Sequence, residues 1–194
     1  MEKKDLKPAG VFKYFEEICQ VPRPSKKEEK MIAYLKTFGA KHNLETKVDE
    51  AGNVLIKKPA TPGKENLQTV VLQSHIDMVC EKNNDVQHDF LTDPIETEID
   101  GEWLKAKGTT LGADNGIGVA TELAILADDS IEHGPLECLF TVDEETGLTG
   151  AFALQEGFMS GDILLNLDSE DEGEIFIGCA GGIDSVAEFT YKEV

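Results

Sequence analysis

The segment TVVLQSHIDMV, at residues 69–79, is the most informative part of the chain for its fold. Its β-branched and apolar residues run almost unbroken up to His75, which is typical of a β-strand that is covered on both faces. His75 and Asp77 stand two residues apart, so a strand directs both polar side chains to one face and Ile76 to the other. The stretch therefore predicts a strand in a sheet between helices, with polar groups at its carboxyl end.

Helical and extended patterns alternate on both sides of this strand. Apolar residues at helical spacing predict helices over residues 8–20 and 25–43, and Ser25 with Glu28 forms a capping box for the second. Residues 85–104 form a polar excursion. Further elements are expected as strands at residues 53–57, 136–142, 162–167 and 174–178, a ribbon at residues 97–104, and helices at residues 114–126 and 148–155. This alternation predicts an α/β domain with a mostly parallel sheet sandwiched between helices.

The charge balance restricts the partners of the chain. Its 194 residues include 38 Asp and Glu against 18 Lys and Arg, which gives a formal net charge of −20 at pH 7. Such a chain repels nucleic-acid phosphates and anionic membrane surfaces, so we expect no nucleic-acid partner and no membrane partner. Divalent cations and cationic ligands are the partners that this charge favours.

The cysteines and the first residues indicate the compartment. Four widely spread cysteines form no C-x-x-C pair and stand within apolar runs, so reduced, buried thiols are expected. They are Cys19, Cys80, Cys138 and Cys179. The first residues lack the apolar core of a secretory signal, and no run approaches the ~18 apolar residues of a membrane span. These features predict a cytoplasmic protein.

Four polar clusters follow expected strands or open the expected helix at residue 114. They are SHIDMV at residues 74–79, GADNG at residues 112–116, DEETG at residues 143–147 and LDSED at residues 167–171. Open α/β sheets bind ligands at the carboxyl ends of their strands, so these clusters form the candidate site. Each also has a plain structural reading, as a hydrogen-bonded histidine, a helix N-cap, a solvated loop and an acidic turn.

The acids within these clusters differ in what their positions permit. Three successive acids at residues 143–145 repel one another unless cations or protons neutralise them. Glu144 and Glu145 are able to point in different directions, so that one binds a metal while the other moves protons. The acidic turn is similar to a calcium loop, but Cys179 stands where that loop needs a bidentate glutamate. This excludes the calcium reading and leaves Asp168 as the one inward-facing ligand.

The four motifs, in this order, closely resemble those of the dinuclear zinc hydrolases that include aminoacylases, peptidase T and carnosinases. Within that family the chain is most similar to the bacterial Xaa-His dipeptidases. The segments CQVPRPS at residues 19–25 and GTTLGADNG at residues 108–116 add to the likeness, which covers nearly all of the chain. The resemblance implies a zinc-exopeptidase-like catalytic domain that hydrolyses small Xaa-His or β-Ala-His dipeptides. The alternatives are an N-acyl amino-acid deacylase, an aminotripeptidase and a non-catalytic metal-binding fragment.

The resemblance also implies a set of metal ligands. Two divalent ions are expected in the site, with zinc as the first choice and cobalt or manganese as alternatives. His75 and Asp168 are expected to bind one ion, and Glu145 the other. Asp114 is expected to bridge both ions and to precede a cis peptide bond.

Two further residues are expected to act without binding metal. The resemblance implies that Asp77 orients the imidazole of His75. It also implies that Glu144 is the general base, which takes a proton from water and delivers it to the leaving amine.

The family pattern extends beyond these residues. Its members place a second terminal histidine ligand far downstream, after a lid domain that helps to bind substrate and usually forms the dimer. Residues 1–182 are therefore expected to be the first part of the catalytic domain. Residues 183–194 are expected to begin the connection into the lid, through which the complete protein is expected to form a homodimer.

Overall fold

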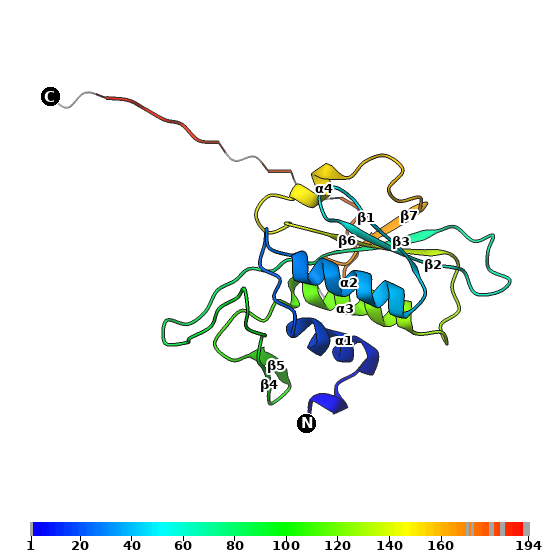
Figure 1. The fold of residues 1–194 in the computed structure, drawn as a ribbon, viewed down its shortest axis with the longest axis horizontal. Helices are drawn as coiled ribbons and strands as arrows, with labels where there is room; N and C mark the ends of the chain where they lie inside the picture. The colour runs from blue at the N-terminus through cyan, green and yellow to red at the C-terminus, as the bar shows by residue number, and fades with distance from the viewer. Residues whose placement is uncertain (1, 170, 172, 179–180, 183–184, 192–194) are drawn as a thin grey trace.

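The central sheet has five strands in the order β1-β2-β6-β3-β7 (Figure 1). The computed structural model describes residues 2–169, 171, 173–178, 181–182 and 185–191. The strands of the sheet are β1 (Glu45–Val48), β2 (Val54–Lys58), β3 (Val70–His75), β6 (Leu136–Thr141) and β7 (Ile163–Asn166). Strand β3 pairs in parallel with β6 and β7, whereas β2 pairs antiparallel with β1 and β6. The α/β class is confirmed, and the sheet is mixed, with its parallel part centred on β3.

Helices cover the two faces of this sheet unequally (Figure 1). Three of them lie on one face: α1 (Ala9–Cys19), α2 (Glu29–Lys41) and α3 (Ala113–Ala127). The short helix α4 (Thr149–Ala153) lies on the other face. Val54 and Ile56 of β2 belong to the large core under the three helices, while Leu55 packs in a smaller cluster on the opposite side. The prediction of a strand covered on both faces is confirmed for β3, and β2 and β6 are covered in the same way.

The polar excursion stands apart from the sheet. It contains the expected ribbon as a two-stranded hairpin of β4 (Thr97–Asp100) and β5 (Trp103–Ala106). A single turn of 3-10 helix, Lys3–Asp5, precedes α1. Throughout the part of the chain that the structure describes, every helix is too short or too polar to cross a membrane.

The capping box predicted for α2 is wrong. The helix begins at Glu29, because Lys26 adopts a left-handed φ of 65° that breaks the helical path. Instead of capping the helix, the Ser25 hydroxyl donates a hydrogen bond to Asp77 Oδ2 at 2.7 Å. Glu28 Oε1 accepts hydrogen bonds from the backbone N–H groups of Lys26 and Asp143. Both polar side chains therefore serve tertiary contacts near the strand ends.

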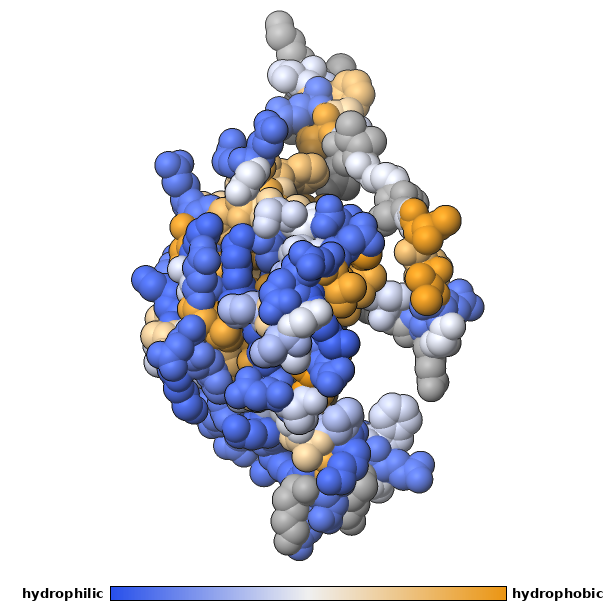
Figure 2. Space-filling model, turned by 90° about the vertical axis from the view of Figure 1, so that its right-hand side faces the viewer, coloured by the Kyte–Doolittle hydropathy of each residue, from blue (hydrophilic) through white to orange (hydrophobic). Residues whose placement is uncertain are grey.

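The strand predicted at residues 174–178 is also wrong. Ile175 and Ile177 are 92% and 102% exposed, and none of the described strands lies beside this segment to receive its backbone hydrogen bonds. Figure 2 shows exposed apolar residues both on the main body and on a segment of the chain that projects away from it. In the expected connection, residues 183–184 and 192–194 lie outside the described residues.

The thiols of the described cysteines are free. Cys19 and Cys138 are buried, as predicted, and Cys80 is half-buried. Burial raises the pKa of Cys19 to about 12 and that of Cys80 to about 11, which keeps both thiols protonated at neutral pH. Cys179 lies outside the described residues.

Candidate metal centre

The site is built around the carboxyl end of β3. His75 and Asp77 lie on the same face, as the two-residue spacing predicts, and their side chains are 1% and 0% exposed. The His75 Nδ1 and Asp77 Oδ1 atoms are 3.2 Å apart. Asp77 also accepts hydrogen bonds from the Ser25 hydroxyl and from the backbone N–H groups of Glu144 and Glu145. The aspartate therefore joins the ends of two strands and holds the imidazole in one orientation.

These contacts keep Asp77 ionised. Burial favours the protonated carboxyl, but hydrogen bonds from His75, the Glu144 backbone and Ser25 outweigh it and lower the pKa of Asp77 to about 2. A buried carboxylate with several donors is a rigid anchor, since each donor would lose its partner if the side chain moved.

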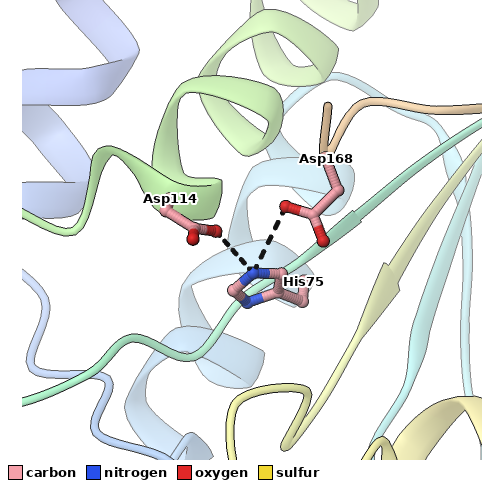
Figure 3. Close-up of side chains that lie close together, drawn as sticks. All are labelled: His75, Asp114 and Asp168. Atoms are coloured by element: carbon pink, nitrogen blue, oxygen red, sulfur yellow. Dashed lines mark hydrogen bonds and ion pairs between the residues drawn. The ribbon is translucent and has the colours of Figure 1, made fainter. Parts of the chain in front are cut away.

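Two further carboxylates approach the other nitrogen of the imidazole (Figure 3). The Asp114 Oδ1 atom lies 2.9 Å from His75 Nε2, and the Asp168 Oδ1 atom lies 3.6 Å from it. Asp114 comes from the start of α3 and Asp168 from the chain that follows β7. Burial opposes the imidazolium, but Asp168 and Asp77 outweigh it and raise the pKa of His75 to about 10. The parallel strands thus bring together residues far apart in the sequence.

The backbone at the start of α3 directs Asp114 into the site. Gly112 adopts a left-handed φ of 68°, and the Asp114–Asn115 peptide bond is cis, as the family resemblance implies. Asp114 itself has a non-helical ψ of 116°, and no side chain caps this helix. The reading of Asp114 as a helix N-cap is therefore wrong, and its carboxylate faces His75.

Glu144 and Glu145 follow β6 and complete the cluster. Each offers a carboxylate oxygen, and these atoms lie within 4.8 Å of one another and of a ring nitrogen of His75. Burial raises the pKa of both glutamates, and neighbouring carboxylates raise it further: Asp168 beside Glu144, and Asp114 beside Glu145. Crowded acids of this kind favour either protons or a bound cation.

The donor set fits a divalent metal. His75 with Asp114 and Asp168, and His75 with Glu144 and Glu145, each place their ligand atoms within 4.8 Å of one another. Imidazole nitrogen and carboxylate oxygen are ligands that zinc, cobalt and manganese accept. A cavity of about 770 Å³ adjoins the cluster, with Glu144 and Asp168 in its wall.

Sequence reasoning missed the residues that support Asp77. The local sequence predicts Ser25 as a helix cap, whereas the structure places it beside Asp77; its position in the segment CQVPRPS is the signal that points to the site. A third acidic group of Glu28, Asp77 and Asp143 is buried in the structure. Its oxygens accept hydrogen bonds from backbone N–H groups and hydroxyls, which indicates a structural network.

Comparison with known proteins places this site in a family. A family model described as peptidase family M20/M25/M40 matches residues 71–189. The chain is 54% identical over 183 residues to the cytosol non-specific dipeptidase of Escherichia coli, covering 94% of this chain and 38% of that protein.

Solved structures agree with this match. The crystal structure of aminoacylhistidine dipeptidase from Vibrio alginolyticus superposes with a TM-score of 0.87 and 57% identity, covering 89% of this chain and 35% of that one. Aminopeptidase PepT from Bacillus cereus gives a TM-score of 0.71 and 26% identity, over 84% of this chain and 43% of that one. The chain thus spans less than half the length of these relatives. From the family match and these likenesses, the chain belongs to peptidase family M20/M25/M40.

Proposed function

We propose that this chain carries the metal-binding and proton-transfer groups of a dipeptidase that acts on Xaa-His and β-Ala-His dipeptides. The observation that carries the proposal is the convergence of Asp114, Asp168, Glu144 and Glu145 on the buried imidazole of His75. The names of two relatives, a cytosol non-specific dipeptidase and an aminoacylhistidine dipeptidase, support dipeptides as the substrate class and a cytoplasmic location.

The proposed ligands hold two divalent ions, with zinc as the expected metal. His75 and Asp168 would bind one ion, Glu145 the other, and Asp114 both. Bound ions supply positive charge that favours deprotonation of water and stabilises a developing oxyanion. The raised pKa values of Glu144 and Glu145 support this assignment, because a cation relieves the mutual repulsion of the acids.

Glu144 is the proposed general base. Its carboxylate stands near His75 in the wall of the cavity, where a peptide carbonyl and a water molecule have room to meet. Burial and the neighbouring acids raise its pKa, which makes the carboxylate a better proton acceptor. It takes a proton from water and delivers it to the nitrogen of the leaving amine.

Asp77 is the proposed partner that orients His75. Its bond to Nδ1 favours the tautomer with the proton on that nitrogen, which leaves the lone pair of Nε2 free to bind a metal. Because Asp77 also holds the backbone of Glu144 and Glu145, it couples the imidazole to both glutamates.

The proposed domain organisation follows the family resemblance. Residues 1–182 form the first part of a catalytic domain, and residues 183–194 begin the connection into a lid domain through which the complete protein forms a homodimer. The greater length of the relatives supports this arrangement.

The experiment uses the complete, zinc-loaded protein, because the family resemblance implies a further histidine ligand downstream, without which the 194-residue chain alone is expected to be inactive. It compares hydrolysis of β-Ala-His, a second Xaa-His dipeptide, a tripeptide and N-acetyl amino acids. We expect turnover of the two dipeptides, and a loss of at least about 10²-fold in kcat for Glu144→Gln with unchanged zinc content. Unchanged kcat would remove Glu144 from the mechanism. Preference for N-acetyl amino acids or the tripeptide would support the deacylase or the aminotripeptidase, and tight zinc binding without turnover would support a non-catalytic module.

A further inference from the structure

Arg23 is a buried cation that the proposed mechanism does not use. It lies in the segment CQVPRPS, between α1 and α2, and is 3% exposed. Its Nη1 atom donates hydrogen bonds to the carbonyl oxygens of Ile76 at 3.1 Å and Asp77 at 3.0 Å. Its Nη2 atom donates to the carbonyl oxygen of Gly112 at 2.6 Å. One guanidinium therefore joins the chain after β3 to the chain before α3.

The glycines around Asp114 make room for this guanidinium. A Cβ atom at Gly112 would lie 2.6 Å from Arg23 Nη2 and 2.7 Å from the sulfur of Met78. A Cβ atom at Gly116 would lie 2.7 Å from the same nitrogen. All three distances are too short for real contacts, so a side chain at either position would displace the arginine. The pattern GADNG thus fits a close approach by Arg23 to the start of α3.

Neighbouring residues fix the segment that carries Arg23. Pro24 forms an isolated parallel bridge with Met78, and Ser25 donates its hydroxyl to Asp77 Oδ2. The contacts of Pro24 and Ser25 thus fix the backbone next to Arg23, and the three hydrogen bonds fix its guanidinium group. A planar fork with fixed donors sets the distance between its acceptors more strictly than a flexible ammonium does.

We infer that Arg23 is a positioning residue of the metal centre, and this inference rests on the proposed function. It holds the backbone that carries His75 and Asp77 at a set distance from the backbone that carries Asp114. The His75 Nε2 and Asp114 Oδ1 atoms are 2.9 Å apart across these two segments. Without Arg23, the buried carbonyl groups of Ile76 and Asp77 and the half-buried carbonyl of Gly112 lose this donor, and the two segments are free to shift. The ligands then meet a metal in altered geometry.

The test uses cobalt as a spectroscopic probe of the 194-residue chain. Arg23→Met removes the guanidinium, and Arg23→Lys keeps a positive charge without the fork. Lys58→Met is the matched control, because Lys58 is also buried and its Nζ donates to the carbonyl oxygens of Ile125 and Asp128 at the end of α3. Cobalt affinity, visible absorption bands and urea unfolding without metal are measured for each variant.

We expect Arg23→Met to lower cobalt affinity by about tenfold or more and to shift the absorption bands. Arg23→Lys is expected to fall between this variant and the unaltered chain. Lys58→Met is expected to unfold at lower urea concentration while keeping the original affinity and bands. If Arg23→Met does not fold, Arg23→Lys decides the outcome.

Two results would overturn the inference and leave the metal centre intact. The first is that the folded Arg23 variants bind cobalt with the affinity and absorption bands of the unaltered chain. The second is that Lys58→Met changes cobalt affinity and absorption bands as much as Arg23→Met does. Failure of the unaltered chain to bind cobalt would instead contradict the proposed function, and the inference would fall with it.

Discussion

Strands β3 and β7 lie side by side and run in the same direction, yet they bring their polar residues to the site in opposite ways. The chain at the end of β3 is buried, with His75 and Asp77 1% and 0% exposed. All four residues of β7, an edge strand of the sheet, are exposed, and the side chain of Asp168 is 27% exposed. One half of the site is thus fixed by packing, and the other supplies charge from the sheet edge.

This difference separates two tasks that one binding site must perform. A buried imidazole with a hydrogen-bonded Nδ1 has its orientation set before any ligand arrives, which lowers the cost of ordering it on binding. An exposed carboxylate keeps its hydration and is free to adjust to a cation. We therefore expect substitutions near β3 to change folding stability, and those after β7 to change mainly metal affinity.

The largest effect is expected from Asp77→Ala compared with Asp168→Ala. Asp77→Ala leaves the buried imidazole of His75 and three partly buried donors without an acceptor, so it should lower the free energy of unfolding by about 3 kcal/mol or more. Asp168→Ala removes a partly exposed acid that shares the imidazole of His75 with Asp77, so it should lower this free energy by no more than about 1 kcal/mol. Urea denaturation with a chelator present measures both values. Equal losses in the two variants would break the comparison.

A smaller effect is expected from pH in the metal-free chain. The pKa of folded His75 is about 10, above the value of about 6.5 for an unfolded histidine. Its stabilising contribution is therefore fully present below about pH 6.5 and is lost as pH rises toward 10. We expect a loss on the order of 2 kcal/mol over this range, after allowing for solvent screening of Asp168. The free energy of unfolding, measured as a function of pH, tests this expectation.

Two variants sharpen the pH experiment. His75→Gln should remove the alkaline loss, and Asp168→Asn should reduce it, because Asp168 helps to raise the pKa of His75. At low pH the dependence has the opposite sign, because the pKa of Asp77 is lowered to about 2 in the folded chain. The contribution of Asp77 to the free energy of unfolding is present above about pH 3.9 and is lost as pH falls toward 2. An alkaline loss that persists in His75→Gln would show that another group causes it.

The smallest effect is expected from Ser25→Ala. This change removes one of the donors to Asp77 and should lower the free energy of unfolding by about 1 kcal/mol. Ser130→Ala is the matched control, because its hydroxyl donates to the exposed carboxylate of Asp128 and should contribute less than about 0.5 kcal/mol. If the two substitutions lower the free energy of unfolding equally, burial does not strengthen the hydrogen bond from Ser25 to Asp77.

Much of the β3 half of the site could be predicted from the sequence. Periodicity alone placed His75 and Asp77 on one face, because alternation along a strand is a local property. The motif order and the family resemblance then selected Asp114 and Asp168, which the structure brings to the same nitrogen of His75. The approach of Asp168 depends on the parallel pairing of β3 with β7, and that of Asp114 on the packing of α3 against β3, neither of which residue spacing specifies.

The remaining features depend on contacts between distant segments. Ser25 fits a capping box by its local spacing, but the left-handed backbone of Lys26 prevents a helix from starting there. The Ser25 hydroxyl donates its hydrogen bond to Asp77 instead. The bonds from Arg23 to the carbonyl groups of Ile76 and Gly112 join segments more than 50 residues apart in sequence. Local propensity carries no information on such partners, because the tertiary fold decides which polar groups meet.

The metal content of the 194-residue chain tests the central claim most directly. The chain is loaded with zinc, freed of excess metal and measured by elemental analysis beside Asp114→Ala, which removes the proposed shared ligand. We predict about two zinc ions per chain, from the two-ion assignment, and a clear fall in the variant. A content that Asp114→Ala leaves unchanged would contradict the assignment of His75, Asp114, Glu145 and Asp168 as a two-metal centre, and a content near zero would contradict its formation without the downstream histidine.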